Sequence, residues 1–417
     1  MAGEKPVDSQ SLRPRLRYCS SKDLHDDWPW IFPDALPTFG LEMDSLAHAF
    51  RGKRVFVTGH TGFKGAWLTE WLLLLGAEVR GYSLPPPTTP ALFDQLGLAA
   101  RIHHQLADVC DPAAVLVAVR EFQPDFVFHL AAQPLVRRSY GEPVVTYATN
   151  VMGTIHVLEA LRVLAKPCAA VFITTDKCYE NRNQSEAYRE EDHLGGADPY
   201  SSSKAAAELA IASWRRSFFS VEQIIRGEIA PVGIASVRAG NVIGGGDWAE
   251  DRIVPDCMRS LGRHEAIVVR NPHATRPWQH VLEPLAGYLM LASRLRQALV
   301  AAEAPTREEL RQLAGPFNFG PARPDERTVR ELVDEVLRHW PGSWMPADGP
   351  GGHAEAQQLH LDSTKAATVL GWRPCWNFAQ AVARTTEWYR AVADDATVAS
   401  GLTGRQIGEY SADPVGH

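Results

Sequence analysis

Cysteine is scarce in this chain and shows no clustering. Six cysteines stand among 417 residues, far apart from one another, and no two form a Cys-x-x-Cys pair. Such spacing disfavours both a disulfide framework and a zinc site, and it is typical of free thiols in a reducing compartment. We therefore expect no metal site and a cytoplasmic location.

The sequence also lacks long apolar runs and an excess of positive charge. The run from Trp71 to Leu75 is followed at once by Gly76 and Glu78, so it is too short to span a membrane. The N-terminus lacks the basic-then-apolar order of a signal peptide. The formal net charge of −7 argues against a broad nucleic-acid or membrane surface. An anionic small molecule would need a local cluster of arginine and lysine.

What the sequence does contain is a regular alternation of strands and helices from Lys53 onward. We expect apolar strands at 54–58, 78–83, 104–107, 125–130, 170–174 and 235–238, and helices at 66–75, 112–122, 144–164 and 202–218. This alternation predicts an α/β fold with a parallel sheet covered by helices on both faces. Past Gly240 the pattern loosens, with helices expected near 283–298, 328–340 and 378–392.

The pattern divides the chain into four regions. Residues 46–240 are expected to form a Rossmann-type, doubly wound parallel sheet that binds a dinucleotide. Residues 241–393 form a smaller, interleaved region, mainly for substrate binding. Residues 1–45 are an appended arm, either partly disordered or packed on a partner subunit through Trp28, Trp30 and Phe32. Residues 394–417 are glycine-rich and polar, which predicts a flexible tail.

Three glycines lie between the first expected strand and the first expected helix. Gly59, Gly62 and Gly65 have the spacing of a dinucleotide fingerprint. One glycine lets the chain turn, one lets the backbone approach a pyrophosphate, and one lets the helix pack closely on the sheet. The helix N-terminus favours the anion. The motif therefore predicts a nicotinamide dinucleotide site.

The second expected strand lacks the acid that would hold the adenosine ribose hydroxyls. It ends at Gly81 to Leu84, with Arg80 nearby, which leaves open either a 2′-phosphate and NADP or an ordinary surface arginine. Asp108 is placed to accept from the adenine amino group, and Ala131 and Ala132 would lie close to the cofactor. The residues predicted to contact the cofactor are Gly59, Thr61, Gly62, Phe63, Gly65, Asp108, Val109, Leu130, Ala131, Ala132, Tyr200 and Lys204.

A tyrosine and a lysine stand four residues apart in the helix expected near 202–218. Tyr200 and Lys204 would lie on one helix face, one turn apart. There the ammonium can lower the pKa of the phenol, which can then take a proton from a substrate alcohol. Together with the glycine motif, the pair predicts oxidation of a hydroxyl by a nicotinamide cofactor.

The motifs taken together resemble the extended short-chain dehydrogenase/reductase superfamily. Within it, three segments are similar to the CDP-glucose 4,6-dehydratase family: residues 58–65, 175–181 and 240–248. The resemblance runs from about Gly52 to Tyr389. It implies a hydro-lyase that uses NAD, acts on a nucleotide sugar and forms a homodimer or a higher homo-oligomer through its long helices, without nucleic-acid or membrane partners. Cytosine as the base rests on this resemblance alone.

Dehydration of this kind links three events: hydride leaves C4, water is lost across C5 and C6, and the hydride returns to C6. Oxidation needs Tyr200 as base, Lys204 beside it and Thr175 to hold the 4-hydroxyl. Elimination needs an acid and a base, for which Asp176 and Lys177 are the candidates. Lys177 acts as the base only if its pKa is lowered by several units; otherwise it stabilises the enolate.

A diphosphate calls for arginine, because the guanidinium binds phosphate through two parallel hydrogen bonds. Arg276 is the first candidate, because the resemblance implies an arginine there, and Arg252 is the second. Asn241 and Asp247 are expected near the nucleotide or sugar, although Asp247 could instead cap a turn. Gln133 and Arg137 are expected to line the sugar pocket.

Two other functions fit part of this pattern. A nucleotide-sugar 4-epimerase would share the glycine motif, Tyr200 and Lys204, but it would not need Asp176 beside Lys177. A non-catalytic nucleotide-binding protein of the same fold would have no reason to keep all of these groups.

Overall fold

The computed structural model describes residues 41–182, 186–301, 304–322, 326–347 and 359–412. Residues 40–417 form one compact unit. The appended arm predicted for residues 1–45 lies almost wholly outside the described residues. Its last five residues differ from the prediction, because helix α1 already begins at Leu41.

A seven-stranded sheet forms the centre of this unit, and all of its strands run parallel. Its order is β11-β6-β5-β4-β1-β2-β3. The strands are β1 (Arg54–Thr58), β2 (Glu78–Ser83), β3 (His103–Leu106), β4 (Phe126–His129), β5 (Cys168–Ile173), β6 (Val232–Ala239) and β11 (Pro316–Phe319). The strand order reverses beside β1, which places a switch-point crevice at the carboxyl ends of β1 and β4.

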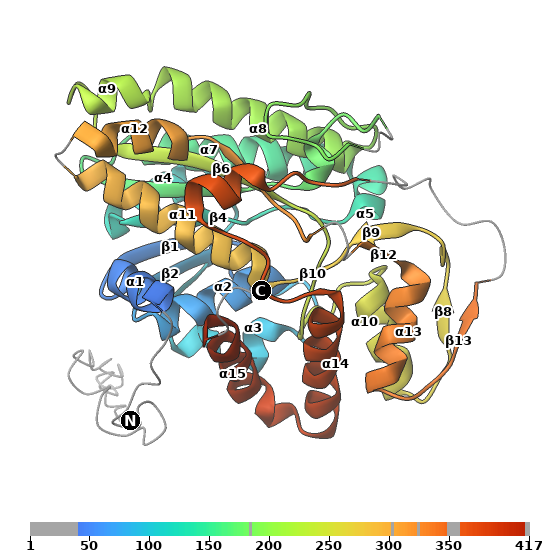
Figure 1. Cartoon of the computed structure of the whole chain (residues 1–417). Coiled ribbons are helices and arrows are strands. Elements are labelled where there is room, and N and C mark those ends of the chain that lie inside the picture. Colours follow the sequence, from blue (N-terminus) through green and yellow to red (C-terminus); the bar gives the residue numbers. More distant parts are fainter. Residues whose placement is uncertain (1–40, 183–185, 302–303, 323–325, 348–358, 413–417) are drawn as a thin grey trace, which may run out of the picture. The chain divides into compact units, whose positions relative to one another are not determined.

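Side chains alternate between the two faces of the sheet and build a core on each. Phe56, Val127 and Phe172 pack on one side with helices α4 (Pro112–Phe122), α7 (Gly153–Leu161) and α8 (Pro199–Ser217). Val57 and Phe128 pack on the other with α2 (Phe63–Leu74) and α11 (Leu282–Val300). Figure 1 shows these helices on both faces of the sheet. The predicted α/β, doubly wound fold is confirmed.

The remaining elements are short or belong to the C-terminal half. The helices are α1 (Leu41–Phe50), α3 (Leu92–Gln95), α5 (Val136–Gly141), α6 (Pro143–Tyr147), α9 (Val221–Ile225), α10 (Ile253–Gly262), α12 (Ala304–Leu313), α13 (Val329–His339), α14 (Phe378–Asp394) and α15 (Ala399–Ala412). Three two-stranded sheets pair β10 (Gln279–His280) with β7 (Val242–Ile243), β12 (Glu326–Thr328) with β9 (Thr275–Pro277), and β13 (Trp344–Pro346) with β8 (Ile267–Val269).

The predicted boundary at residue 240 between the dinucleotide-binding and substrate-binding regions does not separate two independent structural units. Strand β11 pairs with β6 in the main sheet, from Pro316 opposite Ser236 to Phe319 opposite Ala239. The region predicted to be mainly substrate-binding therefore also supplies the last strand of the dinucleotide-binding sheet.

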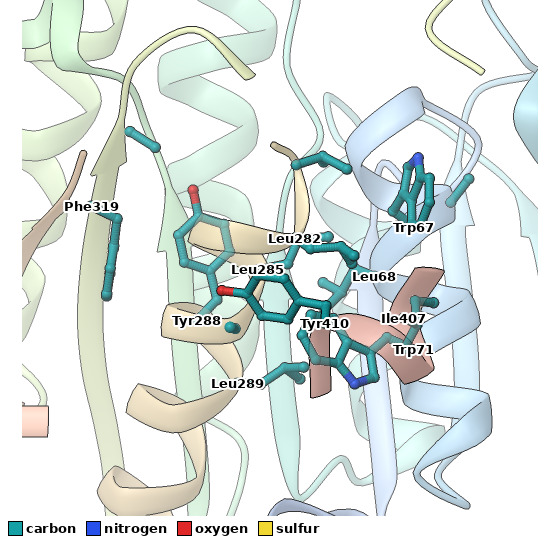
Figure 2. Close-up of a cluster of buried hydrophobic side chains, with 14 of the residues drawn as sticks. Trp67, Leu68, Trp71, Leu282, Leu285, Tyr288, Leu289, Phe319, Ile407 and Tyr410 are labelled. Carbon is teal, nitrogen blue, oxygen red and sulfur yellow. The ribbon is translucent and has the colours of Figure 1, made fainter. Parts of the chain in front are cut away.

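The tail predicted to be flexible from Asp394 onward is instead helical over most of its length. Helix α15 buries Ile407 and Tyr410 against Trp71 of α2, and the rings of Trp71 and Tyr410 meet edge to face at 5.8 Å (Figure 2). Tyr410 also donates to the buried carboxylate of Glu283 at 2.8 Å. Apolar positions spaced along a polar, glycine-containing sequence were enough to dock this helix. In the described residues, no helix is both long enough and apolar enough to cross a membrane.

Candidate active site

The glycine turn between β1 and α2 has the close packing that the fingerprint requires. Gly59 has φ +74°, and a Cβ there would lie 2.7 Å from the backbone nitrogen of Ala131. A Cβ on Gly65 would lie 2.1 Å from the carbonyl oxygen of Gly59. Gly62 is the N-cap of α2 and offers no side chain to the free N–H groups of the first turn. These N–H groups remain available for an anion.

The adenosine end of the crevice is polar but carries no charge at the end of β2. Thr61 Oγ1 and Ser83 Oγ lie 2.8 Å apart, and Thr61 also donates to the Leu84 carbonyl at 2.9 Å. Arg80 points elsewhere: it donates to Gln105 Oε1 at 2.8 Å and to the Ala118 carbonyl at 3.4 Å. Arg80 is thus engaged within the fold, which removes the sequence-based reason for a 2′-phosphate.

Other predicted cofactor residues lie on the neighbouring strand ends. Exposed Asp108 follows β3, and its Oδ1 accepts from the Cys110 backbone N–H at 2.9 Å. Val109 is buried, and its carbonyl lies 2.9 Å from His156 Nδ1. Leu130, Ala131 and Ala132 follow β4, half-buried. Phe63 opens α2, also half-buried.

Tyr200 lies in the first turn of α8, buried beside the end of β5. Burial raises the pKa of Tyr200 to about 12, while the hydrogen bond with the Thr175 hydroxyl and the positive charge of Arg252 lower it. The sequence predicted that Lys204 would lower this pKa. In the structure the Lys204 ammonium donates to the Ile173 carbonyl at 3.2 Å, and burial lowers the pKa of Lys204 to about 8.

Asp176 follows β5 at the same edge of the sheet, in the single turn η3 (Asp176–Cys178). Thr175 Oγ1 donates to Asp176 Oδ1 at 2.9 Å. Burial raises the pKa of the Asp176 carboxyl above its usual value, against the opposing effect of Lys177 and Arg276. A carboxyl group that holds its proton more firmly is suited to act as a general acid. Lys177 itself is half-buried.

The predicted substrate residues divide into two groups. Arg252 and Arg276 lie close enough to the reaction centre to shift the pKa values of Tyr200 and Asp176, respectively. Arg252 also donates to Asp247 Oδ2 at 2.8 Å, and Asp247 Oδ1 accepts from Ala249 N at 3.2 Å, so Asp247 closes a turn. The carbonyl of Asn241 accepts from Gln279 N at 3.3 Å.

The other two predicted substrate residues, Gln133 and Arg137, also bond to groups of the protein itself. Gln133 is buried and bonds through its amide to the Leu135 backbone and, at 3.0 Å, to Thr146 Oγ1. Arg137 is partly exposed on α5 and pairs with Asp251 at 3.1 Å.

Sequence reasoning missed Lys64, which lies in the first turn of α2 and faces the same centre. Burial lowers the pKa of Lys64 to about 8, and the nearby cations Arg252 and Lys204 lower it further, while Asp176 raises it. Its Nζ stands 5.8 Å from the centre of the Tyr288 ring. The position of this lysine inside the glycine motif, in the first turn of a helix expected to be buried, could have indicated its place in the site.

Asn150 connects this centre to the helical segment before it. It lies in the π-helical stretch η2 (Ala148–Met152), and its Nδ2 donates to Ser203 Oγ at 2.9 Å. Its Oδ1 accepts from Gln133 N at 2.8 Å. In the described ranges, no group of three or more histidine, cysteine, aspartate or glutamate side chains could hold a metal ion.

Residues 56–385, which include every one of these positions, match the family model described as GDP-mannose 4,6 dehydratase. The chain belongs to this dehydratase family. It is 46% identical over 344 residues to a CDP-glucose 4,6-dehydratase from Salmonella typhimurium, a match that covers 82% of this chain and 92% of that protein.

More distant relatives of this dehydratase-family chain include epimerases. It is 26% identical over 337 residues to a UDP-glucose 4-epimerase from Mycolicibacterium smegmatis, covering 81% of this chain and 98% of that one. The solved dTDP-glucose 4,6-dehydratase from Streptomyces venezuelae, with NAD bound, has a TM-score of 0.66 and 22% identity over 84% of this chain and 99% of its own. This likeness establishes the shared fold.

Proposed function

We propose that this chain is an NAD-dependent nucleotide-sugar 4,6-dehydratase that converts CDP-D-glucose to CDP-4-dehydro-6-deoxy-D-glucose. The observation that carries the proposal is the meeting of a tyrosine hydroxyl and an aspartate carboxyl at one sheet edge. The Tyr200 phenol and the Asp176 carboxyl are both buried, both have raised pKa values, and both meet the Thr175 hydroxyl. Membership of the 4,6-dehydratase family supports the same reaction.

The glycine turn fits NAD. The free N–H groups at the start of α2 suit a pyrophosphate, and the hydroxyls of Thr61 and Ser83 lie where the adenosine ribose is expected. When bound, the nicotinamide ring would accept the hydride from C4 of the sugar and return it at C6.

The residues of the chain handle the protons of this reaction. Tyr200 takes the proton of the 4-hydroxyl, and Thr175 orients that hydroxyl. Asp176 gives its proton to the hydroxyl that departs from C6. Lys177, which follows Asp176 directly, is proposed to assist removal of the C5 proton, either as the base or by stabilising the enolate of the C4 ketone. Arg276 and Arg252 bind the diphosphate, and Asn241, Asp247, Gln133 and Arg137 shape the pocket around the nucleotide sugar.

The test is to incubate the purified protein with NAD and either CDP-glucose or UDP-glucose, and to follow the sugar nucleotide by mass spectrometry. Loss of one water from CDP-glucose, faster than from UDP-glucose, is the expected result. In heavy water, deuterium should enter at C5. Exclusive formation of the C4 epimer, with no loss of water, would replace the dehydratase by a 4-epimerase.

We also propose that the chain works as a homodimer. Apolar side chains are exposed along the helices beside the site, including Val144 and Val145 of α6, Met152 of η2 and Leu209 of α8; Val144 is 80% exposed and Leu209 61%. A helix with an apolar outer face needs a partner. Light scattering should give twice the chain mass, and Val144→Glu with Leu209→Glu should give monomers. Val268→Glu, on β8 and also exposed, is the matched control.

A cytoplasmic location is the last part of the proposal. Cys110, Cys168, Cys178, Cys257 and Cys375 are all free thiols. Proteins of oxidising compartments usually pair such residues.

A further inference from the structure

A buried carboxylate lies one helical turn beyond Lys204, outside the residues so far assigned to the reaction. Glu208 of α8 is 3% exposed. Its Oε1 accepts from Thr174 Oγ1 at 2.5 Å, and its Oε2 accepts from Ser236 Oγ at 2.8 Å and Arg238 Nη2 at 2.9 Å. Burial alone would raise the pKa of Glu208, but Arg238 and these hydrogen bonds hold it below its usual value. Glu208 is therefore a carboxylate anion.

Three residues on one face of α8 hold three consecutive residues at the end of β5. Lys204 donates to the carbonyl of Ile173 at 3.2 Å, and Glu208 accepts from the hydroxyl of Thr174 at 2.5 Å. Tyr200 shares a hydrogen bond with Thr175. Because positions 200, 204 and 208 are each one turn apart, the helix and the strand end are fixed against each other at three points.

The partner of Glu208 is itself held by the far side of the same turn. Arg238 of β6 donates to Tyr179 Oη at 2.7 Å and to the Glu190 carbonyl at 3.0 Å. Tyr179 follows η3 directly and donates to Asn318 Oδ1 at 2.8 Å. The turn that carries Asp176 is thus held at one end through Thr174 and at the other through Tyr179, and the Glu208–Arg238 ion pair connects the two.

We propose that Glu208 is a positioning residue for the reaction, which fixes Thr175 and Asp176, just after β5, relative to Tyr200 and Lys204 on α8. This inference rests on the proposed dehydratase function. A buried ion pair is weak evidence for stability, because well-packed apolar residues often replace one without loss. The contacts of Glu208 with Thr174, which precedes Thr175, and with Arg238, which holds Tyr179, give it a role that apolar packing could not supply.

Glu208 also contributes to the electrostatics around Lys204. Among the groups that interact with this ammonium, Glu208 and Cys178 raise its pKa against the effect of burial. Lys64 of α2 and His129 of β4 lie within the range of the same charge. Removal of the Glu208 charge should therefore let Lys204 lose its proton at a lower pH.

Two variants separate geometry from charge. Thr174→Val removes the hydroxyl that Glu208 holds and leaves every charge in place. We expect kcat to fall about tenfold, with KM for CDP-glucose and the pH profile unchanged. Glu208→Gln keeps the size of the side chain and removes its charge. We expect a similar fall in kcat and a shift of the alkaline limb of kcat/KM to lower pH.

Because Glu208→Gln leaves Arg238 without its main partner and can impair folding, the double variant Glu208→Met/Arg238→Met removes both charges together. It should fold and still show the lower kcat. Glu159→Gln is the matched control: this carboxylate of α7 accepts from Trp214 of α8 at 2.5 Å, far along the helix from Tyr200, and its loss should leave kcat unchanged.

The inference is wrong if folded Thr174→Val and the folded double variant both keep wild-type kcat, or if losses only follow the folded fraction measured by circular dichroism. A wild-type protein that releases no dehydrated sugar overturns the proposed function instead. In that case the interaction of Glu208 with Lys204 is tested by measuring the pKa of Lys204 by NMR of 13C-labelled lysine. A lower pKa in Glu208→Gln supports the interaction, and an unchanged pKa contradicts it.

Discussion

The hydroxyl of Thr175 donates to the carboxyl oxygen Oδ1 of Asp176 at 2.9 Å and also meets the phenol of Tyr200. One side chain thus joins the group assigned to oxidation and the group assigned to elimination. Substitution of Tyr200 is therefore expected to block oxidation, and substitution of Asp176 is expected to block elimination alone.

Asp176→Asn should stop the reaction after the first hydride transfer. The amide cannot give a proton to the departing hydroxyl, but Tyr200 is untouched. The 4-keto sugar and NADH should accumulate on the enzyme, visible as near-ultraviolet absorbance after one turnover. Release of dehydrated product at the normal rate would place the acid elsewhere.

Tyr200→Phe should abolish the reaction before any NADH forms. The ring still packs in its buried position, but the hydroxyl that takes the substrate proton is gone. Loss of a general base should reduce kcat by about a hundredfold or more. Binding of NAD, measured by calorimetry, should stay close to wild type; near-normal turnover would remove Tyr200 from the mechanism.

Lys204→Met should make the protein less active but more stable at neutral pH. Burial lowers the pKa of Lys204 from 10.5 to about 8, so holding the charged form in the folded state costs up to roughly 3 kcal/mol. This cost is complete below pH 8 and disappears as the pH rises through 10.5. Urea unfolding should therefore show the variant to be more stable than wild type at pH 7, with a smaller difference at pH 10.

Arg276→Ala should raise KM for the sugar nucleotide much more than it lowers kcat. A diphosphate is bound similarly in the ground state and in the transition state. Loss of the arginine therefore weakens substrate binding and leaves the chemical step nearly unchanged. Steady-state kinetics with CDP-glucose measure both constants. A collapse of kcat at constant KM would reassign Arg276 to the chemical step, through its effect on the pKa of Asp176.

Gly59→Ala should disrupt the cofactor site, whereas Gly62→Ala should leave the fold intact. At Gly59 the new methyl group would lie 2.7 Å from Ala131 N, on backbone with φ +74°. At Gly62 the nearest atom is 3.4 Å away. Thermal unfolding should show a large loss of stability for the first variant only. Equal stability of the two would mean that the turn relaxes.

The fold was predictable as far as local pattern controls it. The strands from Arg54 to Ala239 and the long helices between them follow from apolar runs and turn residues, whereas the short helices α3, α5 and α9 were not predicted. Helix α15 was missed because its stability comes from contacts with Trp71 and Glu283, which are distant in sequence. Strand β11 was missed because four residues carry too little pattern by themselves.

Site residues could be predicted from the sequence where they belong to a motif with known chemistry. Residues that reach the site only through tertiary packing could not. Thr175 and Asp176 directly follow β5 at the carboxyl edge of the sheet, and Tyr200 lies in the first turn of α8, beside the end of that strand. The influence of Arg252 on Tyr200, and the positions of Lys64 and Glu208, depend on how distant segments pack. The assigned roles in binding and catalysis remain predictions until the variants are measured.

Strand β11 lies far beyond its partner β6 in the sequence, and this separation affects folding during synthesis. On the ribosome, β6 emerges long before residues 316–319, and until then its outer edge has no partner. Open strand edges invite pairing with other chains. A nascent chain paused between Ala239 and Pro316, or a truncated product ending there, is therefore expected to expose the edge of β6 and to be prone to aggregation.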